Sequence, residues 1–316
     1  MGGIALSTVG SSVAAAFVAV CGLRWLYRRL TAGRRLRQHL AGRTALVTGA
    51  SSGLGLALAR QMSAAGARVI LAARSLDSLQ TVCTELNQGQ DSGGQKPAKA
   101  TCAYLDLADV ASVQLMCKQL LAQNGPIDIL INCAGISSRS VALETKLEVF
   151  EKIMAVNFLG HVAVTSAVAP AMVARGHGQI VAISSVQGKF AIPYRSAYSA
   201  SKHAFQAYFD SLRSELAASG IHILTASMTY IRTNLSLNAV TADGSKHAKM
   251  DPTTAKGMPP ETVAQRILSA LVDGKEDILI ADGWFFSAMS WVLIVGRHVC
   301  PPLYFWVMKK RAQKQT

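Results

Sequence analysis

Short apolar segments that alternate with helix-length segments occupy most of this 316-residue chain. Each short segment is apolar throughout, which is typical of strands that are buried on both faces of a sheet. Helices between such strands indicate parallel pairing. The predicted strands cover residues 43–49, 67–74, 101–107, 127–132, 178–185, 221–228 and 277–282. The sequence therefore predicts an α/β fold with a doubly wound, Rossmann-like parallel sheet, whose ligand binds at the carboxyl ends of the strands.

A glycine-rich turn, "TGASSGLG" at residues 48–55, joins the first predicted strand to a predicted helix over residues 54–65. Glycines allow the backbone to approach a pyrophosphate closely, and a helix N-terminus offers unpaired N–H groups with a positive dipole. The turn therefore predicts a dinucleotide site. Its predicted cofactor contacts are Gly49, Ser51, Ser52, Gly53, Leu54 and Gly55.

The second predicted strand ends at Arg74, where NAD-binding proteins often place an acid for the ribose hydroxyls. A guanidinium at this position can pair with a 2′-phosphate through two hydrogen bonds. We therefore expect NADP(H) to be preferred, with NAD(H) possible; a solvated surface arginine is the alternative. Asp106 and Leu107, which end the third predicted strand, are expected to border the adenine.

Tyr198 and Lys202 lie four residues apart in "SAYSASKHAF", residues 196–205. Residues at this spacing are neighbours on one face of a helix. A nearby ammonium stabilises phenolate and lowers the pKa of a phenol, which can then exchange a proton in catalysis. On this fragment alone, a surface helix with a chance Tyr–Lys pair is the alternative.

Four motifs in this order resemble the short-chain dehydrogenase/reductase family: the glycine turn, "NCAG" at residues 132–135, a serine at 185, and Tyr-x-x-x-Lys at 198–202. The resemblance covers about residues 43–282. Two longer stretches, residues 184–216 and 230–257, are similar to a membrane-anchored subgroup of that family. The implied fold is a single Rossmann-like catalytic domain.

The resemblance implies four catalytic residues. Ser185 is expected to hydrogen-bond the substrate carbonyl, and Tyr198 to act as the general acid or base. Lys202 is expected to lower the pKa of Tyr198 and to bind the nicotinamide ribose, while Asn157 supports a water relay to that lysine. Further implied cofactor contacts are Asn132, Ala134, Gly135 and Thr233. Small residues between Tyr198 and Lys202 are expected where cofactor and helices pack closely.

The chain departs from the family pattern at two places. Cys133 stands where a second asparagine is usual, and Met228–Thr229 stands where Pro-Gly is usual. The cysteine leaves backbone contacts to the ribose intact. A β-branched threonine beside the nicotinamide could narrow the cofactor's seat, so this second departure bears on cofactor affinity.

The formal net charge of +14 is concentrated in the two end segments, which carry eleven of the positive charges and no acid. Nucleic-acid-binding proteins more often spread basic residues over a recognition element, so we expect no nucleic-acid partner. Six scattered cysteines and seven unclustered histidines indicate neither a disulfide framework nor a metal site.

Residues 1–23 contain no charge and are followed at once by arginines. About 20 apolar residues span the hydrocarbon core of a bilayer. We predict a single-pass transmembrane anchor at 1–27 in preference to a cleaved or interfacial segment, and a basic juxtamembrane linker at 28–42. The positive-inside rule favours a cytosolic catalytic domain, with the opposite orientation still open. The family resemblance suggests the endoplasmic reticulum membrane.

The predicted catalytic domain covers residues 43–283, and residues 284–316 form an aromatic segment with a basic tail. Arg297 and the pair Pro301–Pro302 interrupt this segment, so we expect a membrane-surface helix, with packing on the core as the alternative. Residues 234–260 are a candidate lid.

These features favour a membrane-anchored oxidoreductase that uses NAD(P)(H) on a lipid-like carbonyl or hydroxyl. A steroid, a retinoid, a keto-lipid and an acyl-dihydroxyacetone phosphate are the candidate substrates, and a homo-oligomer is possible. The alternative is a cofactor-binding scaffold or sensor with little turnover, which only the Met228–Thr229 departure supports.

Overall fold

The computed structural model describes residues 19, 20, 22, 27, 30–88 and 99–313. The predicted anchor at 1–27 lies almost entirely outside these residues, and so does most of the polar segment between the second helix and the third strand. The account below concerns the described residues.

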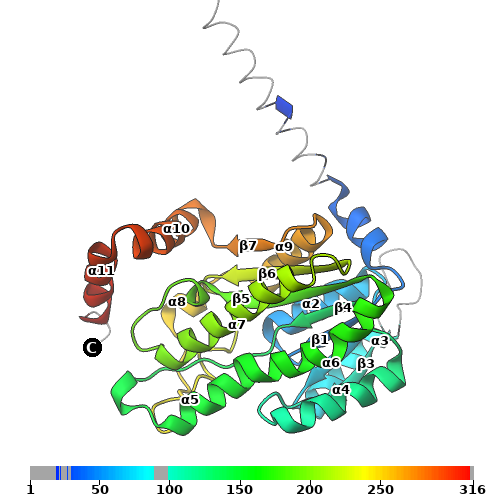
Figure 1. The fold of residues 1–316 in the computed structure, drawn as a ribbon, viewed down its shortest axis with the longest axis horizontal. Coiled ribbons are helices and arrows are strands. Elements are labelled where there is room, and N and C mark those ends of the chain that lie inside the picture. The colour runs from blue at the N-terminus through cyan, green and yellow to red at the C-terminus, as the bar shows by residue number, and fades with distance from the viewer. Residues whose placement is uncertain (1–18, 21, 23–26, 28–29, 89–98, 314–316) are drawn as a thin grey trace, which may run out of the picture.

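Seven parallel strands form one sheet in the order β3-β2-β1-β4-β5-β6-β7, so the predicted doubly wound sheet is confirmed (Figure 1). Chain order reverses between β1 and β4, and at such a switch point the connecting helices leave a crevice at the carboxyl ends of the strands. The strands are β1 (Thr44–Thr48), β2 (Arg68–Ala73), β3 (Thr101–Tyr104), β4 (Ile129–Asn132), β5 (Gly178–Ser185), β6 (Ile221–Met228) and β7 (Asp277–Ile280).

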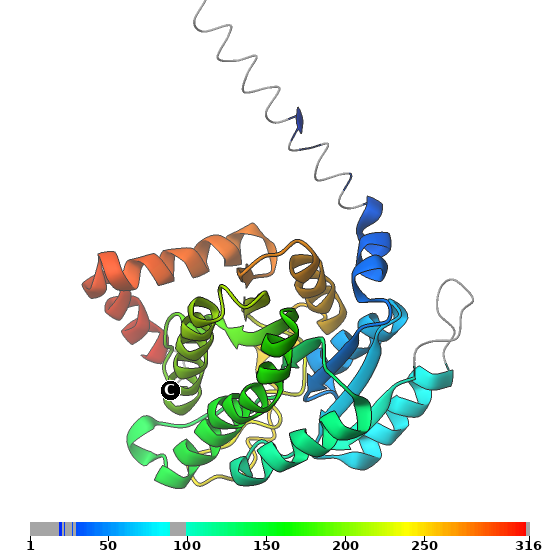
Figure 2. The ribbon, with the colours of Figure 1, turned by 45° about the vertical axis from the view of Figure 1, so that its right-hand side comes forward.

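Helices cover both faces of the sheet (Figure 2). One apolar cluster joins the sheet to α2 (Gly53–Ala64), α3 (Leu76–Gln88) and α9 (Pro260–Val272). A second cluster, on the opposite face, includes α4 (Val110–Asn124), α6 (Gly160–Arg175) and α7 (Ser196–Glu215). Burial on both faces explains why the strands are apolar throughout.

A continuous helical run, Leu147–Arg175, comprises α5 (Leu147–Met154), the short π-helix η2 (Ala155–Leu159) and α6. Among the described residues this run alone has the length and hydropathy of a membrane span. It lies in the body of the fold, where 56% of its most apolar window is buried. Packing against α4 and α7 therefore accounts for its apolar character.

Residues 30–40, part of the predicted linker, form a helix that packs on the body of the domain. Leu40 is fully buried in the cluster that contains α2 and α9. Arg35 forms an ion pair of 2.7 Å with Asp273, and His39 Nε2 lies 2.7 Å from the Gln179 side-chain oxygen. The second half of the linker is thus attached to the catalytic domain.

The C-terminal segment forms two helices, α10 (Gly283–Val299) and α11 (Pro301–Gln313), which extend from the end of β7 to the left side of Figure 1. Tyr304 and Met308 of α11 pack on Phe190 and Ile192, and the Tyr304 hydroxyl donates to Ala191 O at 2.7 Å. Large aromatic side chains elsewhere on both helices stay exposed. Packing on the core therefore holds for one face of this segment, and the membrane-surface helix stays a prediction for the face that is exposed.

The predicted lid, residues 234–260, contains one short helix, α8 (Pro252–Ala255). Val240 N donates to Ser137 O at 2.9 Å, and Arg139 N donates to Val240 O at 2.8 Å. These backbone bonds tie the segment to the loop after β4. The lid is therefore held across the carboxyl edge of the sheet.

Candidate active site

A cavity of about 850 Å³ opens at the carboxyl ends of β1, β4, β5 and β6. The lid and α10 also contribute to its wall. Nearly all predicted site residues lie on this one wall, and the two that do not are Asn132 and Asn157. Those on the wall are Gly49, Ser51, Ser52, Gly53, Leu54, Gly55, Arg74, Asp106, Leu107, Ala134, Gly135, Ser185, Tyr198, Lys202 and Thr233.

The glycine turn is shaped by contacts within the protein as well as by room for a ligand. A Cβ on Gly49 would lie 2.8 Å from Ala134 Cα, and a Cβ on Gly55 would lie 2.3 Å from Gly49 O. Gly53 has a φ of +56°, which favours glycine. The first and third glycines are therefore required for close packing of turn, helix and neighbouring strand.

Thr48 connects this turn to the "NCAG" segment, a role that our sequence reasoning missed. Its hydroxyl accepts hydrogen bonds from Cys133 N at 2.9 Å and Ala134 N at 3.2 Å. It also donates to Ile131 O at 3.2 Å. The threonine directly before the first glycine was the available signal, because a hydroxyl there can bridge two neighbouring strands.

Asn132 lies behind the cavity, contrary to its predicted cofactor contact. It is fully buried, and the two ends of its side-chain amide lie 3.0 Å from Thr165 Oγ1 and 3.0 Å from His161 Nδ1. His161 Nε2 donates to Ala134 O at 2.8 Å. Burial lowers the pKa of His161 to about 3, so this histidine is neutral and supports the "NCAG" turn from within the core.

Tyr198 is buried beside Ser185, and burial raises the pKa of its phenol. A hydrogen bond with Ser185 and the positive charges of Arg139 and Arg195 partly offset that rise. The predicted lowering of this pKa by Lys202 is therefore not seen: burial dominates, and two arginines supply the offsetting charge. Arg139 and Arg195 were missed because neither belongs to a motif.

Lys202 shares the cavity wall with Tyr198, so the helical spacing brings both groups to one site. Its ammonium donates to Ile183 O at 2.9 Å and lies 4.8 Å from the centre of the Phe205 ring. Burial lowers the pKa of Lys202 to about 8. The charge on Lys202 at neutral pH therefore lowers the free energy of unfolding.

Asn157 lies in the short π-helix η2, and π-helical turns are frequent at functional sites. Its Nδ2 donates to Ile136 O at 2.8 Å and to Ser201 Oγ at 3.0 Å, and its Oδ1 accepts from Ile136 N at 2.8 Å. Asn157 therefore positions the turn after Gly135 against α7. Of the small residues between Tyr198 and Lys202, the two serines are buried as expected, whereas Ala200 is exposed.

The cavity fits a nicotinamide dinucleotide. A side chain at position 135 would place its Cβ 3.3 Å from Asn157 Oδ1 and 3.9 Å from Lys202 Nζ. Gly135 therefore keeps this part of the cavity open. Arg74 stands exposed at the wall, with no hydrogen bond or ion pair to another described residue. Thr229 N donates to Ile280 O at 3.0 Å, which holds the Met228–Thr229 departure against β7 and leaves the cavity open.

The buried charge of Lys202 predicts that Lys202→Met stabilises the cofactor-free protein at pH 7. An ammonium with a pKa of about 8 in the fold and about 10.5 when unfolded costs roughly 3 kcal/mol. After allowance for the lost hydrogen bond to Ile183, we expect a gain of about 1–3 kcal/mol in the free energy of unfolding. Chemical denaturation of the full chain would measure it.

The sign of the pH dependence follows from the lowered pKa. Below pH 8 the lysine is charged in both states and the cost is complete; between pH 8 and about 10.5 the folded state gives up its proton first, so the cost disappears. The gain in the variant should shrink over this range. Lys189→Met, at a surface pair with Asp277, should show no such gain; a Lys202→Met variant that is less stable at every pH would contradict this account.

Comparison with known proteins agrees with this geometry. A family model described as short chain dehydrogenase matches residues 43–243. A Drosophila melanogaster relative, "Dehydrogenase/reductase SDR family protein 7-like", is 47% identical over 281 residues, covering 89% of this chain and 84% of the relative. A Danio rerio relative, "Dehydrogenase/reductase SDR family member 7B", is 46% identical over 283 residues, or 89% of each chain.

The solved structures give the same result. An alcohol dehydrogenase from the archaeon Thermococcus sibiricus, in complex with 5-hydroxy-NADP, superposes with a TM-score of 0.64 at 26% identity. The match covers 75% of this chain and 95% of the archaeal chain. The matched family model, the relatives along most of the chain and the shared fold lead to one conclusion: the chain belongs to the short-chain dehydrogenase/reductase family.

Proposed function

We propose that this oxidoreductase is an NADPH-preferring reductase of a lipid-like carbonyl and works at a membrane surface. One observation carries the proposal: Ser185, Tyr198 and Lys202 share a single cavity with the glycine turn. Arrangement of a phenol, a hydroxyl and an ammonium around one space suits addition of hydride and a proton to a carbonyl.

Each catalytic side chain has a defined task. The Ser185 hydroxyl accepts a hydrogen bond from Gln187 N at 3.1 Å, and a substrate oxygen would take the Ser185 proton in place of the Tyr198 phenol. The Tyr198 phenol, protonated at neutral pH because burial raises its pKa, donates its proton to that oxygen. Bound NADPH would supply the hydride. The positive charges of Arg139 and Arg195 stabilise the phenolate that remains, and Lys202 is placed to bind the nicotinamide ribose.

The cofactor preference rests on Arg74. Its guanidinium is exposed on the cavity wall at the end of β2, with no partner among the described residues. A 2′-phosphate could accept two of its hydrogen bonds. This supports NADP(H) over NAD(H).

The proposal of a lipid-like substrate is based on the side of α10 that faces the cavity. Phe286, Met289 and Leu293 line the cavity on the side of the C-terminal helices. Apolar surface of this kind suits a steroid, a retinoid, a keto-lipid or the acyl chain of an acyl-dihydroxyacetone phosphate.

The membrane contact rests on the exposed faces of α10 and α11. Trp284, Trp291 and Trp306 are 81%, 52% and 57% exposed, and Lys309 and Lys310 are exposed near the end of the second helix. Aromatic and basic side chains together favour the interface of an anionic bilayer. With the predicted anchor, this supports work at a membrane surface; the endoplasmic reticulum is proposed from the family resemblance and the cytosolic domain from the positive-inside rule.

The scaffold alternative has no structural support beyond the departure that suggested it. Met228 is buried in the core, and Thr229 lines the same cavity as Tyr198 and Lys202. A protein that only bound a nucleotide would need neither of these buried titratable groups.

Replacement of Tyr198 by phenylalanine tests the reductase. Loss of a general acid should lower kcat by about 10²–10⁴-fold while NADPH still binds. NADPH oxidation with a panel of carbonyl lipids would measure this. Tyr208→Phe, on the same helix, is the matched control and should turn over normally. Equal rates for wild type and Tyr198→Phe would refute the assigned acid, and tight NADPH binding without turnover would favour the scaffold.

Replacement of Arg74 by aspartate tests the cofactor preference. Charge-assisted hydrogen bonds contribute about 1.5–3 kcal/mol, so the ratio of kcat/KM for NADPH over NADH should fall about 10–100-fold. Steady-state kinetics with both cofactors would measure the ratio. An unchanged ratio would mean that Arg74 does not touch the 2′ position.

Tryptophan fluorescence tests the C-terminal membrane contact, because three of the four tryptophans lie on α10 and α11. In a Trp25→Phe variant all remaining emission comes from these helices. We expect brominated anionic lipids to quench it in reconstituted vesicles, and Trp291→Glu with Trp306→Glu to reduce the quenching. Emission that responds only to aqueous iodide would place these helices away from the bilayer.

A further inference from the structure

The cavity wall is strongly basic at the end away from the glycine turn. Across the described part of the chain, seven basic residues line the cavity and Asp106 is the one acid. Asp106 and Arg74 follow β3 and β2, at the cofactor end, and Lys202 belongs to the catalytic group. Five basic residues therefore surround the remaining space without an acid on the wall: Arg139, Lys152, Arg195, Lys246 and Arg311.

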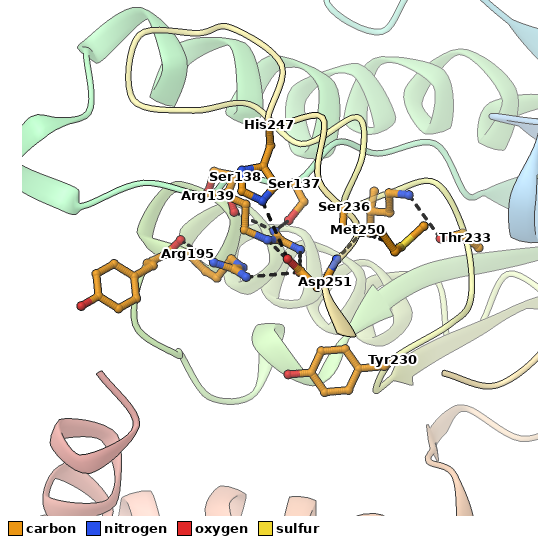
Figure 3. A network of polar contacts seen from close by, with 12 residues as sticks. Ser137, Ser138, Arg139, Arg195, Tyr230, Thr233, Ser236, His247, Met250 and Asp251 are labelled. Atoms are coloured by element: carbon orange, nitrogen blue, oxygen red, sulfur yellow. Dashed lines mark hydrogen bonds and ion pairs between the residues drawn. The ribbon is translucent and has the colours of Figure 1, made fainter. Parts of the chain in front are cut away.

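Two of these arginines are held in place by the lid (Figure 3). Arg139 Nε donates to Asp251 Oδ2 at 2.9 Å, and its Nη2 contacts the same oxygen. Arg195 Nη2 reaches that oxygen at 3.4 Å. Side-chain exposures of 11% for Arg139 and 12% for Arg195 show that both are largely removed from water. One carboxylate thus orients two buried guanidinium groups.

The positive charge in this region exceeds the negative charge. Arg139 uses further N–H groups on Ser137 Oγ and Ser138 O, whereas the Arg195 guanidinium makes one other hydrogen bond within the described part of the chain, to Tyr194 O at 3.0 Å. Burial, Arg139 and Arg311 all lower the pKa of Arg195, which falls to about 10. Charges buried without full compensation are costly, and an anion in the cavity would remove that cost.

Arg311 adds a third guanidinium from α11. Its Nη2 donates to the Tyr230 hydroxyl at 2.8 Å, and its Nε is buried without a hydrogen-bond partner among the described residues. Arg311 also lines the cavity, and a buried donor without a partner is a group that a polar ligand could satisfy. The phenol of Tyr230 lies near Arg195, to which it is electrostatically coupled.

We propose that Arg139, Arg195 and Arg311 form a binding subsite for an oxyanion, a phosphate monoester or a carboxylate, at the polar end of the substrate. Arginine suits this role because its planar donor array matches both groups. Arg139 and Arg195 also act electrostatically on Tyr198, so the anion lies close to the reacting carbonyl. The apolar part of the substrate then extends along Phe286, Met289 and Leu293.

The inference rests on the proposed function in one respect, because it takes this cavity to be the substrate site. Among the candidate substrates it favours an anionic lipid over a neutral steroid or retinoid. Asp251 is a positioning residue in this account: it orients the arginines from outside the cavity wall and reduces their net charge.

The test is calorimetric binding of octyl phosphate, octanoate and octanol to the full chain. Saturating NADP⁺ fills the phosphate positions of the cofactor, and a parallel titration omits it. We expect at least one of the two anions to bind at least about tenfold more tightly than octanol, as charge-assisted hydrogen bonds predict. The tighter of the two anions identifies the phosphate or the carboxylate as the preferred group.

Matched variants locate the anion. Arg195→Gln and Arg311→Gln should reduce its affinity about tenfold or more, whereas Arg74→Gln, at the cofactor end, should leave it unchanged. Asp251→Asn should increase the affinity for the anion, because it removes a negative charge beside the arginines. A misfolded protein would not show this gain. Two results would overturn the proposal: anions that bind no better than octanol, or anion binding that depends on Arg74 and not on Arg195.

The same titrations separate this proposal from the proposed reductase. Octyl phosphate or octanoate binding that requires Arg195 without NADP⁺ present would support the subsite even if the chain failed to turn over any carbonyl. Conversely, an active reductase whose anion binding is unaffected by Arg195→Gln would keep its function and lose this subsite.

Discussion

Parallel pairing of β1 with β2 on one side and β4 on the other is the constraint on which this structure depends. It makes the chain leave β1 and β4 toward opposite faces of the sheet, so the two following loops diverge and leave a crevice between them. Thr48 and the backbone of Ala134 hold those loops together at the base. Gly49 allows the approach, because a side chain there would meet Ala134. The cofactor site is thus a consequence of strand order, and the turn residues adapt the chain to it.

Burial determines the electrostatics of the site. The same desolvation raises the pKa of the Tyr198 phenol and lowers that of the Lys202 ammonium. Both shifts favour the neutral forms, so the surrounding charges decide how ready the phenol is to give up its proton. Arg139 and Arg195, on the cavity wall, contribute to that readiness. In the function and subsite proposed above, proton donation and substrate recognition share these charges, which couples the chemistry to the electrostatics of the bound molecule.

The C-terminal helices present apolar side chains both to the cavity and to the outside of the molecule. Phe286, Met289 and Leu293 of α10 face the cavity, whereas Trp291 and Trp306 face outward. A hairpin attached through Tyr304 and Met308 can satisfy both because the contact with the body uses only part of its apolar surface. α10 is apolar over most of its surface, so packing on the body covers only part of its apolar side chains, and the proposed membrane contact concerns those that stay exposed.

The sequence by itself determined the sheet, the glycine turn and the group of Ser185, Tyr198 and Lys202. Continuous apolar runs have few other solutions, and a spacing of four residues fixes neighbours on a helix. Only the tertiary structure decided which asparagines reach the cavity: Asn132 and Asn157 turn their amides to backbone and side-chain partners behind it. It also decided the charges around Tyr198. Arg139, Arg195, Asp251 and Arg311 are up to 172 residues apart in the chain, and no local pattern encodes a meeting that depends on how the lid and α11 close over the sheet.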